Sequence, residues 1–230
     1  MRSMLLSVIF CLISSASWGM LHSTDNASWT DLVENPNDGL VYKKFQATPF
    51  TGIVTATADD PIQRSYKDGV KHGEWVEFDA SGLVKSKSKV SHGRLRLKIN
   101  FEEGEETTRE EYDYWSSGGL YQKWIYKNGQ FHGVTKTYYL NGQLWFINPY
   151  KNGKTHGLVQ FYDENGQILS TSNWKDDFRH GLEQQYFENG RLRRRVNWQN
   201  GEIHGLEEKF NVDGLLISSS KYKNGVEVSD

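Results

Sequence analysis

Glycines recur along the second half of the chain at alternating intervals of 11 and 13 residues, as between Gly142, Gly153 and Gly166. An Asn or Asp precedes most of them, and Asn-Gly and Asp-Gly are the strongest short signals for a β-hairpin with a type I′ turn. A long helix is excluded, because each interior glycine destabilises a helix by about 1 kcal/mol relative to alanine. The chain is therefore predicted to fold as short strands joined by tight turns.

These turns belong to a repeat of 24 residues that a His-Gly pair marks. The pairs are His72-Gly73, His132-Gly133, His156-Gly157, His180-Gly181 and His204-Gly205. Counted from the histidine as position zero, position +6 is aromatic, +10 is glycine, +12 is aliphatic and +18 is mostly aromatic. Apolar residues thus fall on even positions, which is the period of a strand, so positions +2, +6, +12 and +18 are expected on one face.

The predicted fold class is all-β, an elongated single-sheet antiparallel β-meander in which each hairpin of about 24 residues is one repeat. An extra half-repeat, residues 95–106, is expected to add one strand, and His92 takes the place of the Asn in a turn. About sixteen strands, each followed by its turn, are expected between residues 40 and 222.

Three segments carry a resemblance to a known family. Gly153–Gly157 reads GKTHG and Gly201–Gly205 reads GEIHG, and with the aromatic residues of the second strand they resemble the MORN repeat in its bacterial variant. Gly39–Gly52, GLVYKKFQATPFTG, looks like the start of the YwqK-family antitoxins of toxin–antitoxin systems. The resemblance covers residues 39–226. It implies a β-meander that acts as a scaffold or interaction surface, without catalytic residues.

The first residues differ from the rest of the chain. Residues 1–19 have the layout of a secretory signal peptide, because Arg2 precedes an apolar run of about ten residues and small residues follow. Cys11, the single cysteine, lies in this segment, so no disulfide is expected after its removal. The protein is therefore predicted to be exported, to the periplasm, the cell envelope or the extracellular space.

Two further regions follow the predicted signal peptide. Residues 20–38 are predicted to be a linker or a short helix, with Thr30 as the N-cap of a helical turn near Trp29. Residues 39–230 are predicted to form the MORN-type β-repeat domain.

The evenly spaced histidines raise the question of metal binding or catalysis. Zinc ligands lie about 2.0–2.1 Å from one ion, whereas equivalent residues of successive hairpins lie roughly 9–10 Å apart. Acid–base catalysis needs one distinct residue in a cleft, and the sequence carries no phosphate-loop, nucleophile or metalloprotease motif. The His-Gly pairs are therefore predicted to be structural, with each ring bonded to a neighbouring backbone group. No enzymatic activity, metal or cofactor is expected.

Tyr150, Trp174, Trp198 and Tyr222 occupy position +18 and form the candidate binding face. Trp and Tyr are enriched at interfaces, and an open sheet leaves apolar area for a partner. The leading prediction is an exported, non-enzymatic repeat scaffold that binds another protein through its elongated sheet. Two alternatives stay open. One is binding of envelope lipid headgroups or a glycan through the aromatic column, and the other is antitoxin-like neutralisation of an exported toxin.

The charge of the chain argues against nucleic acid as a partner. The chain has 27 Lys and Arg residues and 29 Asp and Glu residues, which gives a net charge of -2. It therefore lacks the excess of positive charge that is typical of a nucleic-acid-binding protein. The densest basic run is Arg193-Arg194-Arg195, and the strand period places Arg194 on the face opposite its two neighbours. This run is therefore not expected to form one basic patch.

Overall fold

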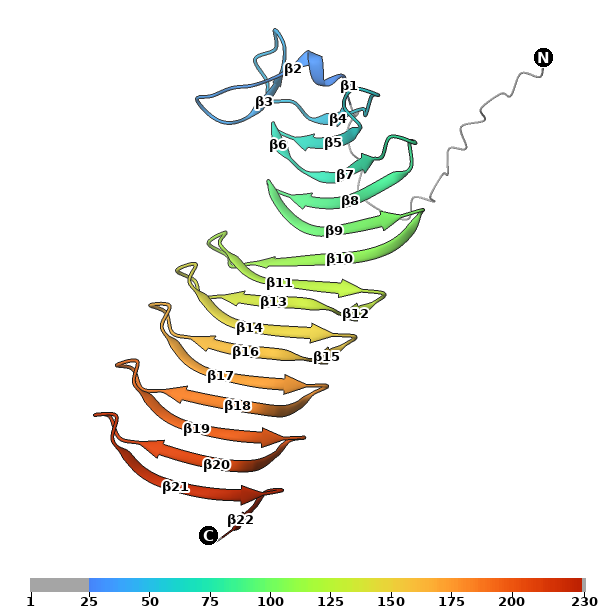
Figure 1. Cartoon of the computed structure of the whole chain (residues 1–230). Helices are drawn as coiled ribbons and strands as arrows, with labels where there is room; N and C mark the ends of the chain where they lie inside the picture. The colour runs from blue at the N-terminus through green and yellow to red at the C-terminus, as the bar shows by residue number, and fades with distance from the viewer. Residues whose placement is uncertain (1–24, 229–230) are drawn as a thin grey trace, which may run out of the picture.

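The computed structural model describes residues 25–228, which form one open β-sheet with a small cap at its N-terminal end (Figure 1). The predicted signal peptide, residues 1–19, lies outside the described residues. The predicted fold class is confirmed, since twenty strands form a single sheet and stack along one axis (Figure 1). Within residues 25–228, no helix is long and apolar enough to cross a membrane.

The strands follow one another in chain order. The N-terminal elements are β1 (Asp25–Ala27), the 3-10 helix η1 (Trp29–Asp31), β2 (Leu32–Glu34) and β3 (Val41–Lys43). The first part of the array contains β4 (Gly52–Val54), β5 (Ile62–Lys67), β6 (Val70–Lys71), β7 (Gly73–Phe78), β8 (Val84–Ser91), β9 (Arg94–Glu102) and β10 (Glu105–Tyr114). The second part contains β11 (Leu120–Lys127), β12 (Gln130–Phe131), β13 (Gly133–Tyr138), β14 (Leu144–Lys151), β15 (Lys154–Thr155), β16 (Gly157–Tyr162), β17 (Ile168–Lys175), β18 (Phe178–Tyr186), β19 (Leu192–Gln199), β20 (Glu202–Phe210), β21 (Leu216–Lys223) and β22 (Val226–Val228).

Pairing is antiparallel from β4 to β22, and the one exception lies at the N-terminal edge. There β1, which lies outside the predicted repeat domain, pairs with β4 in parallel, with Asp25 opposite Gly52. The physical reason is the connection: the chain between β1 and β4 is long enough to cross over, as parallel strands require, and it folds into the cap. The cap strands β2 and β3 pair only with each other as a separate two-stranded sheet.

The expected extra half-repeat is present as β9 and the turn that follows it. A turn at Glu103-Gly104 ends the strand at Glu102 rather than at Glu106. The twenty strands exceed the expected sixteen partly because the chain leaves strand geometry at His72, His132 and His156, which separates β6, β12 and β15 from the strands that follow them. The strands β1 and β22 add to the two ends.

Type I′ turns form the first of two turn classes along the array. Both residues have positive φ at Asn128-Gly129, Asn152-Gly153, Asn200-Gly201 and Asn224-Gly225, as this turn requires. Asp176-Asp177 adopts the same conformation without glycine, at φ 52° and 72°. Asp is one of the few residues that tolerate this region, and here the Asp177 Oδ1 accepts the N–H of Thr155 at 2.8 Å.

The turns at position +10 belong to a second class. Only the glycine has positive φ there, and Gly166 donates its N–H to the Asp163 carbonyl at 3.0 Å, while Asp163 donates to the Gln167 carbonyl at 2.9 Å. This is a type I turn followed by a left-handed glycine, so the prediction of type I′ turns is wrong at these positions. The Asp163 side chain explains the choice, because its Oδ1 accepts the N–H groups of Asn165 and Gln167.

A bulge in the first strand of each hairpin reverses the alternation of its side chains. Thr135 lies opposite Asn148, but the register shifts between Thr137 and Tyr138, and Tyr138 lies opposite Leu144. Because directly opposite residues share a face, positions +3, +5, +12 and +18 lie together and +2 lies on the other side. The prediction that +2 joins the +18 face is therefore wrong. The residues at +2 are partly exposed on the opposite face: Val134 37%, Leu158 42%, Leu182 36% and Leu206 47%.

The cap contains the buried apolar cluster of the protein. Within residues 20–38, the described part forms β1, η1 and β2 rather than a linker. The N-cap of η1 is Ser28 rather than Thr30, and the Ser28 N–H donates to Asp31 Oδ2 at 3.1 Å. Six residues from the cap and the adjoining strands form the cluster: Ala27, Leu32, Val41, Phe50, Val54 and Tyr66. The cap thus covers the first strands of the sheet and leaves the rest of the array open.

Candidate functional site

The candidate site lies on one face of the repeat array, which we call the inner face and define by positions +3, +5, +14, +16 and +18. Several of its side chains are nearly excluded from solvent although no described element covers them, whereas Phe161 at +5 is 37% exposed. Thr135 is 3%, Val159 4% and Val196 0% exposed. The strands of the array are drawn as arcs (Figure 1), and side chains on the hollow side of a bent sheet crowd together. The opposite side, which carries +2, is the outer face.

The predicted binding residues form every second member of a continuous row on the inner face. Each +18 residue lies directly opposite a residue at position +23, beyond the next type I′ turn, as Trp174 lies opposite Arg179. Phe131 stacks between Tyr126 and Tyr150, with ring centroids 4.7 Å and 5.0 Å apart. We call this row the strip: Tyr126, Phe131, Tyr150, Thr155, Trp174, Arg179, Trp198, Ile203 and Tyr222.

Sequence reasoning missed the +23 residues, because Phe131, Thr155, Arg179 and Ile203 share no chemistry that would mark a repeat. The positions of these residues could nevertheless have been predicted from the sequence. A two-residue turn pairs residues at fixed offsets, so the residue five positions after each +18 aromatic is its cross-strand neighbour. The strip could therefore have been read from the turn geometry rather than from residue type.

The glycine of each His-Gly pair lies on the other side of the +18 ring. Gly133, Gly157, Gly181 and Gly205 are directly opposite Tyr150, Trp174, Trp198 and Tyr222. These glycines have φ between 80° and 123°, a region that other residues rarely adopt. A Cβ on these glycines would meet the side chain at +17 of the preceding repeat, as a Cβ on Gly157 would lie 3.0 Å from the Pro149 ring.

The histidines lie beside the type I′ turn at position +20 of their own repeat. The His156 Nδ1 is 3.2 Å from Asp176 Oδ1, and the His204 Nδ1 is 3.2 Å from Asn224 Oδ1. The His72 Nδ1 accepts the N–H of His92 at 3.5 Å, and the Nδ1 of His180 is buried without a partner among the described residues. The backbone N–H of His132 donates to the Ile125 carbonyl at 2.9 Å.

No three His, Cys, Asp or Glu side chains within residues 25–228 come close enough to hold a metal ion. The rings of His72, His156 and His204 each contact a turn residue of their own repeat. The one close pair of rings is His72 and His92, with centroids 5.3 Å apart, and both belong to one repeat.

A cation lies between two indole rings at the centre of the strip. The Arg179 guanidinium lies 5.5 Å from the Trp174 ring centroid and 4.9 Å from that of Trp198. Cation–π contacts of this kind contribute about 0.5–1 kcal/mol each when exposed and more when desolvated. The Arg179 Nε is also 3.4 Å from Glu183 Oε2, which ties the strip to the middle of the inner face.

Two carboxylates share an arginine beside this stack. Glu183 and Glu207 are 4% and 8% exposed, and Arg194 donates from Nε to Glu207 Oε1 at 2.6 Å and from Nη1 to Glu183 Oε1 at 3.4 Å. Burial raises the pKa of Glu207, but the hydrogen bond and charge of Arg194 outweigh it and hold the pKa below its ordinary value. Arg195 pairs with Glu208 on the outer face, so the three arginines are divided between faces, as predicted.

A pocket of about 350 Å³ opens on the inner face beside Trp174 and Arg179. Asn148 and Glu183 line it; the Oδ1 of Asn148 is buried and accepts no hydrogen bond from the described residues, whereas the Oε2 of Glu183 lies 3.4 Å from the Arg179 Nε. An unpaired buried acceptor costs roughly 1–3 kcal/mol. The Asn148 Oδ1 therefore offers a place for an N–H donor from a bound molecule, next to an aromatic surface.

The fold and the inner face define an open, single-sheet repeat scaffold. The model of the MORN repeat variant matches three consecutive segments, residues 131–152, 155–176 and 179–200, so these segments are MORN-variant repeats. Each match begins at a +23 residue of the strip. The resemblance of Gly39–Gly52 to the YwqK-family antitoxins has no counterpart in these matches.

Comparisons with whole proteins add little. No curated protein matches the chain. Among solved structures, a porin-like protein from Bacteroides uniformis is 7% identical over 80% of this chain and 89% of that chain, with a TM-score of 0.17. A likeness this low supports no conclusion on fold or function.

Proposed function

We propose that the protein is a non-enzymatic scaffold that binds a protein partner along its inner face, with Trp174, Arg179 and Trp198 at the centre of the contact. The observation that carries the proposal is the Arg179 guanidinium held between two indole rings beside a pocket. Trp, Tyr and Arg dominate the hot spots of protein interfaces. Their alternation along one row gives a partner a continuous surface across several repeats.

The pocket supports a specific chemistry for the contact. Asn148 Oδ1 is a buried acceptor without a donor among the described residues, and the Trp174 ring forms part of the same pocket. A Lys or Arg side chain of the partner would supply an N–H donor to Asn148 and a cation to the ring. The partner is therefore expected to present a basic side chain to this pocket.

The test compares two matched sets of tryptophan variants. The protein is used to capture its partner from extract of its own cells, the captured protein is identified, and its affinity is then measured with both proteins purified. Trp174→Ala and Trp198→Ala remove strip residues, whereas Trp145→Ala removes a ring from the outer face, where Trp145 is 40% exposed.

Each strip variant is expected to weaken binding about thirtyfold, the equivalent of a hot-spot residue worth about 2 kcal/mol. The Trp145 variant should bind as tightly as the unchanged protein. Equal affinity of all three variants would rule out the inner face as the binding surface.

The alternative partners are separated by the same variants. Glycans stack on aromatic faces, and Arg179 already covers a face of both indole rings, so a protein partner is favoured. Titration of a glycan or of anionic lipid vesicles with tryptophan fluorescence as the readout would show saturable binding only if that alternative holds. Identification of the captured protein as a toxin would support antitoxin-like neutralisation.

We also propose that the chain is exported, on the layout of residues 1–19. The intact mass of the protein from the cell envelope or medium is expected to lack the signal peptide. Uncleaved protein confined to the cytoplasm would contradict export.

A further inference from the structure

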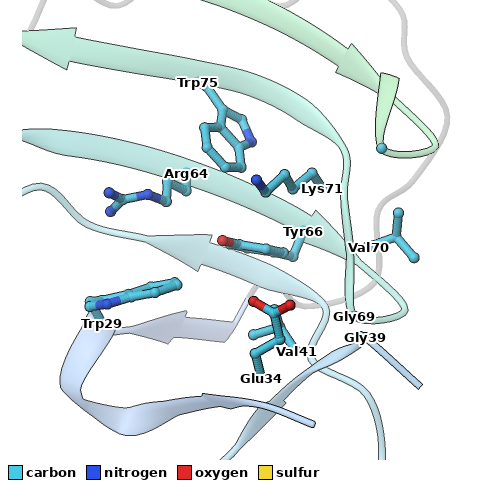
Figure 2. A pocket seen from close by; sticks show the side chains of 11 residues that line it. Trp29, Glu34, Gly39, Val41, Arg64, Tyr66, Gly69, Val70, Lys71 and Trp75 are labelled. Carbon is cyan, nitrogen blue, oxygen red and sulfur yellow. The ribbon is translucent and has the colours of Figure 1, made fainter. Parts of the chain in front are cut away.

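A second pocket lies between the cap and the first strands of the sheet, and we call it the cap pocket (Figure 2). Its volume is about 550 Å³, within the range of roughly 300–1,000 Å³ that small-molecule sites occupy. It shares no residue with the strip. The side chains that project into it come from η1, β2, β5, β6 and β7: Trp29, Glu34, Arg64, Tyr66, Lys71 and Trp75.

Arg64 is part of the wall of the cap pocket and has its charge already balanced. Its guanidinium lies 5.0 Å from the Trp29 ring centroid and 5.8 Å from that of Trp75, and Figure 2 shows it between these two rings. Its Nη2 donates to Asp60 Oδ1 at 2.9 Å and its Nη1 to the Ile62 carbonyl at 3.2 Å. Arg64 therefore holds the two indole rings and leaves little charge for a ligand.

Three other groups face the cap pocket with no protein partner of matching chemistry. Tyr66 is only 4% exposed, yet its hydroxyl makes no hydrogen bond to any residue in the range 25–228. Lys71 holds its ammonium 5.0 Å from the Trp75 centroid without an ion pair in that range, and Glu34 likewise has none. The Tyr66 hydroxyl faces the cap pocket (Figure 2), where it is free to donate a hydrogen bond to a bound molecule.

The chemistry of these three groups defines the ligand. Lys71 is a cation, Glu34 is an anion, and the Tyr66 hydroxyl is a neutral donor because burial raises its pKa and keeps the proton on the oxygen. A ligand with one charge would satisfy Lys71 or Glu34 and meet repulsion from the other. A ligand with both charges would satisfy both.

We propose that the cap pocket binds a small zwitterion that carries a carboxylate and an ammonium group, as a free amino acid does. The carboxylate pairs with the Lys71 ammonium and accepts the hydrogen bond of the Tyr66 hydroxyl. The ammonium pairs with Glu34, which lies on the opposite side of Tyr66 from Lys71 (Figure 2). The site is independent of the protein-binding function proposed above.

The test is calorimetric titration of the full protein with each of the common amino acids, with acetate and methylammonium as probes of a single charge. At least one amino acid is expected to bind, and each single-charge probe should bind at least about tenfold more weakly, since it loses one charge-assisted contact. Lys71→Met and Glu34→Gln should each weaken amino-acid binding about ten- to hundredfold, and Tyr66→Phe about two- to tenfold.

Matched controls come from β5 and β7, two of the strands that line the cap pocket. Lys67→Met on β5 and Glu74→Gln on β7 make the same chemical changes outside the cap pocket and should leave the affinity unchanged. The Trp174 and Trp198 variants should also bind the amino acid normally. The proposal is overturned if no amino acid binds up to millimolar concentration, if acetate binds as tightly as the best amino acid, or if the control variants lose affinity to the same extent.

Discussion

Replacement of Arg194 by Met tests whether a single cation holds the inner face together. Arg194 lies between Glu183 and Glu207, whose side chains are 5% and 9% exposed. Methionine keeps an apolar stem in place but removes every donor, so the two carboxylates face each other. The remaining cations are Arg179, 3.4 Å from Glu183, and Lys209, 3.8 Å from Glu207.

The expected loss follows from the burial of these groups. Removal of one partner of a buried ion pair costs about 3–5 kcal/mol, because the other charge stays buried without compensation. Arg179 and Lys209 are 42% and 51% exposed, so solvent weakens their attraction for the two carboxylates but does not abolish it. We therefore expect Arg194→Met to lower the free energy of unfolding by about 3 kcal/mol at pH 7.

The loss should depend on pH in a defined direction. The folded pKa of Glu207 lies below its ordinary value, despite the opposing effect of burial, because of Arg194. A carboxylate of this kind stabilises the fold above its unfolded pKa, and the stabilisation disappears as the pH falls through the folded pKa. In the variant, burial acts without Arg194 and the carboxyl becomes neutral at higher pH. The difference between variant and unchanged protein should thus be full at neutral pH, begin to shrink as the pH falls through the raised pKa of the variant, and disappear once the pH is below the folded pKa of the unchanged protein.

Urea unfolding at pH 7 and at about pH 3.5, followed by circular dichroism, measures this difference. Amide exchange of β18 to β20 locates it, because repeat arrays can open locally. Arg195→Met is the control, since Arg195 pairs with Glu208 on the outer face and is 47% exposed, and its loss should be smaller. A cost below about 1 kcal/mol, a cost equal to that of the control, or a cost independent of pH would refute the reasoning.

Two further variants test the cap and the histidine column. In Gly52→Ala the new Cβ would lie 2.1 Å from the Asp25 carbonyl oxygen, so β1 must shift. We expect a loss of about 1–3 kcal/mol confined to the cap, seen as lost amide protection in β4 with β16 to β21 unchanged; full protection would contradict it. His156→Ala removes the contact with Asp176 at 3.2 Å and should lower stability by under about 1 kcal/mol in thermal unfolding, with metal content unchanged. Stoichiometric zinc that this variant loses would contradict a structural role.

The repeat made much of the fold predictable because turn chemistry is local. Asn152-Gly153 and its equivalents specify a left-handed pair of residues, and a strand of fixed length follows each turn. The cap was not predictable in this way. Its parallel strand β1 pairs with β4 across a long connection, and the cluster that includes Ala27 and Phe50 forms between segments that no repeat relates.

The faces of the sheet were predictable only up to the bulge. Leu182 and Tyr186 are separated by an even number of residues, so the strand period alone puts them on one side. The register shift between Gln185 and Tyr186 adds one step and moves Leu182 to the outer face. A bulge follows from backbone geometry near the turn, and a pattern of apolar residues does not record it.

The polar inner face and the open architecture depend on each other. Each hairpin of a repeat array contacts only its neighbours, and the described chain supplies no second layer over β11 to β22. A wholly apolar inner face would leave a large exposed patch, which favours aggregation. Here Glu183, Arg194 and Glu207 pair with one another in place of a covering layer, while Trp174 and Trp198 lie at the edge of this face. The buried charges are thus paired within the sheet itself, which leaves the aromatic edge for the proposed partner.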